Sequence, residues 1–285
     1  MGRTLRPDPP MQIAVISMET SRQRRECMQA QLAGMDLAWH FHPGTVVRQF
    51  PPEYDHAARR RWFGFDLAWG EIGCLLSHRA GWERCLASGG ACWCVLEDDI
   101  EILPGFATAL AALERSAQAA TPPWDLVRLM QLLPRRGWRQ YSLPALPAIN
   151  ARGPQRGRGR SVPPAPEDAR EWRLMAYHRQ PGGTHGYVIT PRGARRMLEY
   201  TRRIWEPVDN AIDSYWRHGL DVFCLEPAVI APRREAPSEI GARGRGRRPF
   251  WPGVRRDVVK GLGLPRRMWH NYRRYGRAWA RRREA

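Results

Sequence analysis

Four carboxylates occur within the five residues Glu97-Asp98-Asp99-Ile100-Glu101, in a chain whose formal net charge is +18. They directly follow the apolar run 91–96, which is typical of a buried strand. In an extended segment, side chains two residues apart share a face, so Glu97, Asp99 and Glu101 can converge while Asp98 points toward the fold. Carboxylate oxygens suit Mg²⁺ or Mn²⁺, which offset the charge of a diphosphate. The alternative is a solvated acidic turn that caps the helix predicted after Pro104.

Basic side chains follow the first predicted strand. Arg22, Arg24 and Arg25 lie at the amino end of a predicted helix. Guanidinium groups and free backbone amides at such a position bind phosphate. A solvated helix face is the alternative, because arginine is abundant throughout this chain.

Two histidines require different interpretations. His78 lies on an apolar helix and is interpreted as a core histidine, since no serine–acid pattern accompanies it. His185 belongs to Thr184-His185-Gly186, which follows two glycines, so the backbone there can approach a ligand closely. The alternative for this second segment is an ordinary glycine turn that leads into a core strand.

A third set of acids follows a proline turn. Asp209 and Asp213 lie one turn apart on one face of a predicted helix. One of them could act as a general base toward a hydroxyl group. Asp209 could equally be the N-cap residue of that helix, which does not exclude the catalytic role.

Alternating strand and helix patterns predict the scaffold for these groups. We expect strands at 12–17, 37–41, 91–96, 124–130, 184–190 and 221–225, and helices at 20–34, 71–88, 105–118, 191–203 and 209–219. This alternation indicates an α/β sandwich around a mostly parallel sheet, in which ligands bind beyond the carboxyl ends of the strands. Residues 48–68 are expected to form a loop, and the Arg-, Gly- and Pro-rich segment 134–170 a mobile loop.

Composition and charge divide the chain into three parts. We expect a disordered stretch at 1–10, one domain at 11–232, and a basic tail at 233–285. Residues 241–285 contain 15 Arg or Lys against two acids, a net charge of 15 − 2 = +13, so most of the excess charge belongs to a tail that is separable from the core. Lys260 is the only lysine among the 46 basic residues, which points to coding bias as well as function.

The same data indicate where the protein acts. No apolar stretch is long enough to span a membrane, no signal peptide is apparent, and the six cysteines lack the spacing of a zinc site, which is typical of free thiols in a cytoplasmic protein. Aromatic residues between the arginines of 241–285 favour peripheral contact with the anionic inner face of the cytoplasmic membrane. The alternative for this tail is a disordered basic extension.

Three short blocks, in this order and spacing, resemble glycosyltransferase family 25, the bacterial lipooligosaccharide galactosyltransferases. The first is Val15-Ile16-Ser17 with Arg24-Arg25. The second runs from Gly73-Cys74-Leu75-Leu76-Ser77-His78 and Trp82 to Leu96-Glu97-Asp98-Asp99. The third is Gly183-Thr184-His185-Gly186-Tyr187-Val188-Ile189 with Pro207-Val208-Asp209. The similarity extends over about residues 12–230 and is weak at 48–68 and 133–178.

The resemblance implies a GT-A-like, Rossmann-like fold that binds a UDP-sugar, with galactose as the expected hexose and a lipid-linked glycan as the acceptor. It places Glu97 and Asp99 as ligands of Mn²⁺ or Mg²⁺, in the position of a D-x-D motif. The nucleotide-sugar is expected to contact residues of the three blocks: Ser17, Arg24, Arg25, Asp98, Thr184, His185 and Gly186. Asp209, or Asp213 beside it, is expected to deprotonate the acceptor for an inverting displacement.

Other classes of function compete with this one. A pI near 10.9 suggests a nucleic-acid-binding protein, but no known nucleic-acid-binding signature accompanies the charge, so specific nucleic-acid binding is not expected. A metal-dependent phosphate-ester hydrolase normally has more histidine and aspartate ligands at several strand ends. An inactive relative that binds glycans has the same sequence features as an active enzyme.

Overall fold

The computed structural model describes residues 10–130, 142–144, 149–150, 171–177, 183–233 and 262–283. The stretch 1–9, most of the predicted loop at 134–170 and the segment 234–261 lie outside these ranges. Within the predicted loop, two short strands are described, β6 (Ser142–Pro144) and β7 (Ile149–Asn150). Both pair with the longer strand β8 (Glu171–Tyr177).

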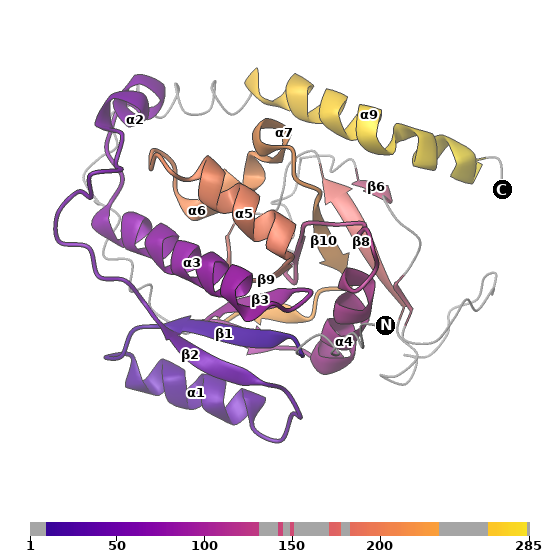
Figure 1. Cartoon of the computed structure of the whole chain (residues 1–285), viewed down its shortest axis with the longest axis horizontal. Coiled ribbons are helices and arrows are strands. Elements are labelled where there is room, and N and C mark those ends of the chain that lie inside the picture. The colour runs from indigo at the N-terminus through magenta and orange to yellow at the C-terminus, as the bar shows by residue number, and fades with distance from the viewer. Residues whose placement is uncertain are drawn as a thin grey trace, which may run out of the picture.

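A nine-stranded mixed sheet forms the centre of the protein (Figure 1), and its path follows the order β2-β1-β3-β9-β5-β10-β8-β6, with β7 beside β8. The other members of this path are β1 (Gln12–Ser17), β2 (Trp39–Pro43), β3 (Trp93–Glu97), β5 (Leu126–Arg128), β9 (Gly186–Ile189) and β10 (Val222–Glu226). Two further strands, β4 (Ile100–Ile102) and β11 (Ile230–Pro232), form a separate antiparallel pair.

Seven of the nine strands run in one direction, because β6 and β7 are antiparallel to β8 and therefore share the direction of β10. β1 is parallel to both β2 and β3, and β10 is parallel to β5. β9 is antiparallel to both β3 and β5, so β5 has the direction of β3, whereas β9 and β8 run the opposite way. The expected mixed α/β architecture with a mostly parallel, Rossmann-like central sheet is confirmed.

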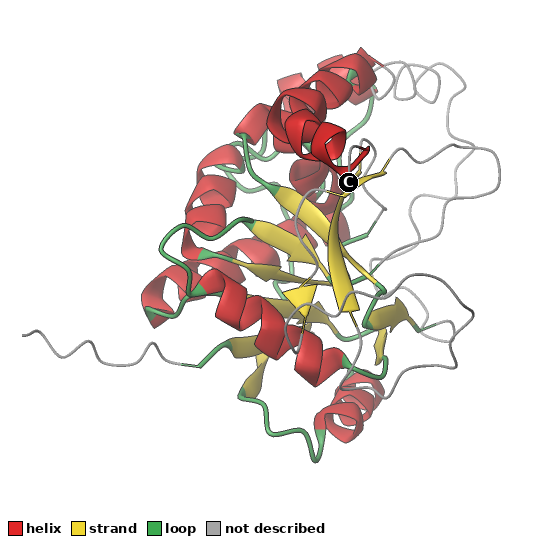
Figure 2. Cartoon of the chain, turned by 90° about the vertical axis from the view of Figure 1, so that its right-hand side faces the viewer, coloured by secondary structure: helices red, strands yellow, loops and turns green. Residues whose placement is uncertain are grey.

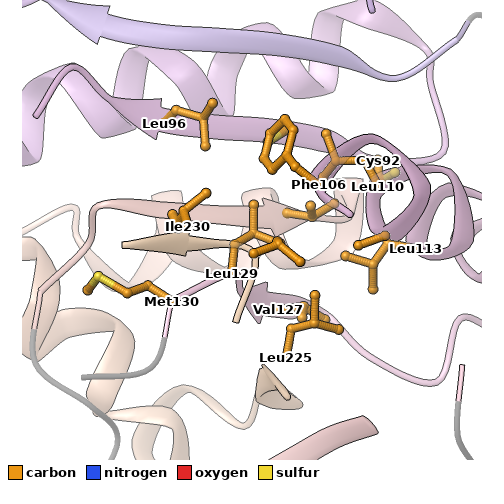
Figure 3. Close-up of a cluster of buried hydrophobic side chains, with 14 of the residues drawn as sticks. Cys92, Leu96, Phe106, Leu110, Leu113, Val127, Leu129, Met130, Leu225 and Ile230 are labelled. Carbon is orange, nitrogen blue, oxygen red and sulfur yellow. The ribbon is translucent and has the colours of Figure 1, made fainter. Parts of the chain in front are cut away.

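Helices cover both faces of the sheet (Figure 2). One face packs against α1 (Arg22–Leu32) and α4 (Phe106–Ala117), and the other against α3 (Trp69–Ser88), α5 (Pro191–Tyr200) and α6 (Val208–Asp213). Alternation along β3 explains the two cores, because Cys94 and Leu96 belong to one and Trp93 and Val95 to the other. Figure 3 shows part of the first core, where Leu96, Phe106, Leu129 and Ile230 meet between β3, α4, β5 and β11.

The expectation of a loop throughout 48–68 is wrong, because α2 (His56–Phe63) lies within it. The Asp55 side chain caps this helix by accepting a hydrogen bond of 2.9 Å from the backbone N–H of Ala58. Gly64 ends it in the left-handed conformation, with φ of +81°. The buried Phe63 ring lies 6.2 Å from that of Trp205, and buried Arg59 donates a hydrogen bond of 3.5 Å to the Trp205 carbonyl. The helix is therefore held by tertiary packing that its Arg-rich sequence does not reveal.

The basic tail is not wholly separable from the core. Its described part is the helix α9 (Leu264–Arg283), which packs near α7 (Tyr215–His218) and along one edge of the fold (Figure 1). Arg274 forms two hydrogen bonds of 2.5 Å with Asp221, and the Tyr275 hydroxyl donates a third of 2.5 Å to the same carboxylate. No helix in the described ranges combines the length and the apolar character that crossing a bilayer requires.

A buried histidine is expected to make stability depend on pH. The ring of His218 contacts the carbonyl of Ala211 through Nε2 (3.1 Å) and accepts from the Leu220 N–H at Nδ1 (3.4 Å), which requires the neutral form. Burial lowers the pKa of His218 to about 4, so only the unfolded chain gains a proton as the pH falls below 6.5. This histidine alone is expected to reduce the free energy of unfolding by about 2 kcal/mol between pH 6.5 and 5.

Urea unfolding at several pH values measures this loss. His218→Gln should be less stable than wild type at pH 7, yet lose less stability on acidification. Equal pH slopes for both proteins would contradict the assignment.

Candidate active site

A cavity of about 480 Å³ opens at the carboxyl ends of β1, β2 and β3. β1 lies between β2 and β3, so the connection from β1 leads to one side of it and the later strand β3 is added on the other side. In α/β proteins, such a reversal of strand order leaves a crevice in which ligands bind. Gly73 lets α3 approach this edge, since a side chain there would collide with the Thr45 carbonyl oxygen. The lining residues are Ile16, Ser17, Met18, Thr20, Arg24, Gly44, Thr45, Val46, Val47, Trp69, Gly70, Gly73, Cys74, Ser77, Glu97, Asp98 and Asp99.

The acidic cluster is a turn, not one extended segment. Glu97 is the last residue of β3, Asp98 and Asp99 form the turn, and Ile100 begins β4. Glu101 is exposed within β4, and no metal-ligand group of the described residues includes it. The expectation that Glu101 converges with Glu97 and Asp99 is therefore wrong, because the turn interrupts the two-residue alternation.

Glu97 contacts two other segments, the residues directly before β9 and the helix α3. Its Oε1 accepts from the Thr184 hydroxyl at 2.6 Å and lies 3.4 Å from the Nε2 atom of His78 on α3. Burial by itself raises the pKa of Glu97, but the hydrogen bond from His78, the electrostatic interactions with His78 and His185, and the hydrogen bond from Thr184 outweigh burial and lower it to about 2. Glu97 is therefore ionised at neutral pH.

A chain of buried side chains orients this bond. The Tyr187 hydroxyl accepts a hydrogen bond of 2.8 Å from the Trp82 indole and lies 2.8 Å from the Nδ1 atom of His78. Its single hydrogen is thus directed to Nδ1, which leaves the hydrogen of the neutral imidazole on Nε2, facing Glu97. His78 is a satisfied core histidine, as expected, but its link to Glu97 and the role of Tyr187 were not predicted.

Asp99 and His185 complete a group that can hold a cation. Ligand atoms of Glu97, Asp99 and His185 all lie within 4.8 Å of one another. The Oδ1 atom of Asp99 and the Nδ1 atom of His185 are buried and have no hydrogen-bond partner. Burial, followed by the charge of Glu97, raises the pKa of Asp99. Two unpaired ligand atoms beside an ionised carboxylate fit a divalent ion, because buried polar atoms are otherwise paired.

The pairing of β3 with β9 brings these residues together. Leu96 is the register partner of Gly186, so the residues after β3 and those before β9 meet at one edge of the sheet. His185 was predicted as a nucleotide contact; the structure places it against the two acids predicted to hold the metal. The position of His185 directly before a predicted strand is visible in the sequence. The sequence does not show that this strand pairs with β3, and this pairing is what brings His185 to the two acids.

The cationic side chains at α1 separate into two environments. Arg24 forms an ion pair of 2.9 Å with Asp98, and both residues line the cavity. Arg25 stacks on Phe41, with its guanidinium carbon 4.2 Å from the ring centroid, and is not among the lining residues. Ser17 lines the cavity at the end of β1. Of the two arginines predicted to approach a nucleotide, the geometry therefore favours Arg24.

Asp209 and Asp213 also differ. Asp213 accepts a hydrogen bond of 2.8 Å from buried Arg128, which also donates to the Gly183 carbonyl. Burial raises the pKa of Cys74 well above its usual range, and the charges of Glu97, Asp209 and Asp99 add to this effect. The Asp209 carboxylate accepts a hydrogen bond of 2.8 Å from the Asn210 backbone N–H, and Asp209 is not among the residues that line the cavity. The N-cap of α6 is Pro207, not Asp209, because the helix begins at Val208.

Gly186 has a packing role in this structure. A side chain there would place its first carbon 2.5 Å from Ile230 Cδ1 and 2.8 Å from Leu96 Cδ2, both in the core. The glycine lets β9 lie flat against this core, and Gly186 is not among the residues that line the cavity.

Gly186→Ala is expected to destabilise the fold by about 1–3 kcal/mol through overpacking. Thermal or urea unfolding checks this value. Gly89→Ala, at a glycine with φ of +70° and no neighbour within 4 Å, separates backbone strain from overpacking. If the Gly186→Ala variant is as stable as wild type, the neighbouring core side chains rearrange to accommodate the added methyl group.

Comparison with known proteins identifies relatives of this arrangement. A family model described as "Glycosyltransferase family 25 (LPS biosynthesis protein)" matches residues 11–212. A human protein named "Inactive glycosyltransferase 25 family member 3" is 30% identical over 241 residues, which covers 79% of this chain and 37% of the relative. The bovine "Probable inactive glycosyltransferase 25 family member 3" is 27% identical over 255 residues, with the same coverage.

A relative named as active also matches. The zebrafish (Danio rerio) "Procollagen galactosyltransferase 1" is 26% identical over 184 residues, which covers 59% of this chain and 26% of the relative. The chain thus spans only about a third of the length of the human and bovine relatives.

Proposed function

Because the chain belongs to glycosyltransferase family 25, we propose that it is a metal-dependent glycosyltransferase that moves a hexose from a UDP-sugar to a glycan hydroxyl. The donor hexose proposed is galactose, in line with the name of the zebrafish relative. The acceptor proposed is a glycan of lipopolysaccharide or lipooligosaccharide, in line with the description of the family model. The fold proposed for this activity is GT-A-like.

The observation that carries this proposal is the group formed by Glu97, Asp99 and His185 beside the cavity. Its ligand atoms approach within 4.8 Å, and two of them are buried and unpaired. Carboxylate oxygens favour Mn²⁺ or Mg²⁺, and one imidazole is compatible with Mn²⁺. When bound, such an ion supplies positive charge to the departing diphosphate.

The remaining residues are proposed to bind and orient the donor. A volume of about 480 Å³ is in the range of cavities that hold ligands of this size. Arg24, fixed by Asp98, adds positive charge where the α1 backbone begins, and Ser17 adds a hydroxyl at the end of β1. His78 and Thr184 keep Glu97 ionised and oriented, as partners of metal ligands commonly do.

Asp209 is proposed to accept the proton of the acceptor hydroxyl. The Asp213 carboxylate is engaged by Arg128, whereas the Asp209 carboxylate accepts a hydrogen bond from the Asn210 backbone N–H. Proton removal makes the acceptor oxygen a better nucleophile. Its attack on the anomeric carbon forms the new glycosidic bond as the bond to UDP breaks, and a single displacement of this kind inverts the configuration.

A second candidate is a catalytically inactive protein that binds glycans. The names of the human and bovine relatives favour it. Incubation of the full chain with a panel of UDP-sugars and Mn²⁺ separates the candidates: release of UDP supports the enzyme, and glycan binding without release from any donor supports the inactive relative.

The metal assignment predicts the behaviour of three variants. Asp99→Asn and His185→Ala should each reduce Mn²⁺-dependent UDP release by at least about 100-fold, a loss of about 2.7 kcal/mol of transition-state stabilisation. Mn²⁺ binding measured by calorimetry should weaken in parallel. Glu101→Gln, which removes an exposed carboxylate two residues from Asp99, is the matched control and should behave as wild type. Normal turnover of Asp99→Asn in EDTA would refute the assignment.

The base assignment predicts a separate effect. Asp209→Asn should lower kcat by about 10²–10⁴-fold, with little change in the KM of the UDP-sugar, because the base acts on the acceptor. Steady-state kinetics with saturating acceptor measures both. Asp213→Asn should chiefly lower the melting temperature, since it leaves buried Arg128 without its carboxylate. An unchanged kcat for Asp209→Asn would assign the base to another group.

A further inference from the structure

The helix α9 is packed with its apolar side outward. Leu264, Met268, Trp269 and Tyr272 form a stripe at the helical spacing i, i+4, i+5 and i+8, and their exposed fractions are 38%, 44%, 61% and 66%. The Trp269 and Tyr272 rings stack on each other, with centroids 6.2 Å apart. A helix on the surface of a soluble domain normally turns such a stripe toward the core.

The inner side of the same helix is held by polar contacts and by the Tyr275 ring, whose centroid lies 5.4 Å from that of Phe223. Arg274 and Tyr275 bind the Asp221 carboxylate, Asn271 is 1% exposed, and the guanidinium carbon of Arg267 lies 4.1 Å from the centroid of the Trp216 ring. Asp221 is itself 7% exposed, so charged partners fix α9 at a buried carboxylate. These contacts hold the helix in the one orientation that leaves its apolar stripe uncovered.

Exposed large apolar side chains are concentrated in two places within the described ranges. Val46, Trp62, Phe65 and Trp69 belong to the segment from the end of β2 to the start of α3, of which Val46 and Trp69 line the cavity. The other five lie between Leu262 and Tyr272. An exposed apolar patch rimmed by charge marks an interaction surface. Here the rim is cationic, because Arg266 and Arg273 are exposed beside the stripe.

We propose that the outer face of α9 is a docking surface for an anionic lipid bilayer. Aromatic rings with polar edges partition to the lipid–water interface, and arginine beside them attracts anionic headgroups. The segment 241–285, with its net charge of +13, adds to this attraction. The inference does not depend on the proposed reaction; if that reaction holds, the surface brings the enzyme to a lipid-linked acceptor.

Two other occupants fit less well. Nucleic acid binds arginine, but it gives no reason for Leu264 and Met268 to be exposed beside the aromatic rings. A second copy of this chain would set the arginines of one α9 against those of the other, which like charges oppose. A bilayer accommodates both the apolar stripe and its cationic rim.

Co-sedimentation of the full chain with vesicles tests the proposal. The vesicles are phosphatidylcholine alone and phosphatidylcholine mixed with phosphatidylglycerol. Wild type should bind the anionic vesicles at least about tenfold more tightly than the neutral ones, and less tightly as salt is raised. Trp269→Ser combined with Tyr272→Ser should weaken binding to anionic vesicles at least about tenfold. Trp62→Ser, at another exposed tryptophan, is the matched control and should bind as wild type.

Arg266→Glu combined with Arg273→Glu should abolish the preference for anionic lipid. Circular dichroism shows whether each variant is folded. UDP release toward a soluble acceptor, measured without vesicles, keeps this test separate from that of the reaction. Unchanged vesicle binding by the aromatic variant would overturn the proposal. So would wild type that binds no vesicle but forms a dimer lost in the aromatic variant, or that binds duplex DNA instead of vesicles.

Discussion

The ionised, partly buried carboxylate of Glu97 is the group on which the arrangement of the candidate site depends. It ends β3, and its charge is tolerated there because Thr184 and His78 donate to it from two other elements. His78 in turn is oriented by Tyr187, whose hydroxyl accepts from Trp82. One ionised carboxylate therefore links α3, β3 and the segment before β9, since a partly buried charge is stabilised by the hydrogen bonds it accepts.

Arginine satisfies most of the other buried acids. Asp98 pairs with Arg24, Asp213 with Arg128, Asp125 with Arg192, and Asp221 with Arg274. In the part of the chain that the structure describes, the Oδ1 atom of Asp99 has no hydrogen-bond partner, although 46 basic residues are available in the sequence. An unpaired carboxylate oxygen beside the ionised Glu97 distinguishes a place for a cation from an ordinary acidic turn.

The excess positive charge has a structural consequence as well. Because Arg274 is bound at Asp221, part of the basic segment becomes a helix of the fold with a fixed inner side. The outer side, with Trp269 and Tyr272, is then presented in a defined orientation to whatever it contacts. The polar contacts on the inner side fix α9 to the fold, and the apolar side chains on its outer side stay exposed. This combination is the physical basis for treating α9 as an interaction surface.

The sequence by itself determined the main alternation of strands and helices, the strand that leads into Glu97, and the position of the acids at the carboxyl edge of the sheet. These follow from local periodicity and from the rule that strands of one direction end at one edge. It did not reveal α2, which lies in a segment expected to form a loop, because the Arg-rich interior of that helix lacks a clear apolar periodicity.

Only the tertiary structure decided which acids converge. The turn at Asp98 and Asp99 excludes Glu101, the register of β9 against β3 brings in His185, and Arg128 engages the Asp213 carboxylate. Likewise, the orientation of α9 follows from Asp221, more than 40 residues away in sequence. Each of these outcomes rests on a contact between segments distant in the chain, and local periodicity does not contain the strand pairing or the ion-pair partner that fixes it.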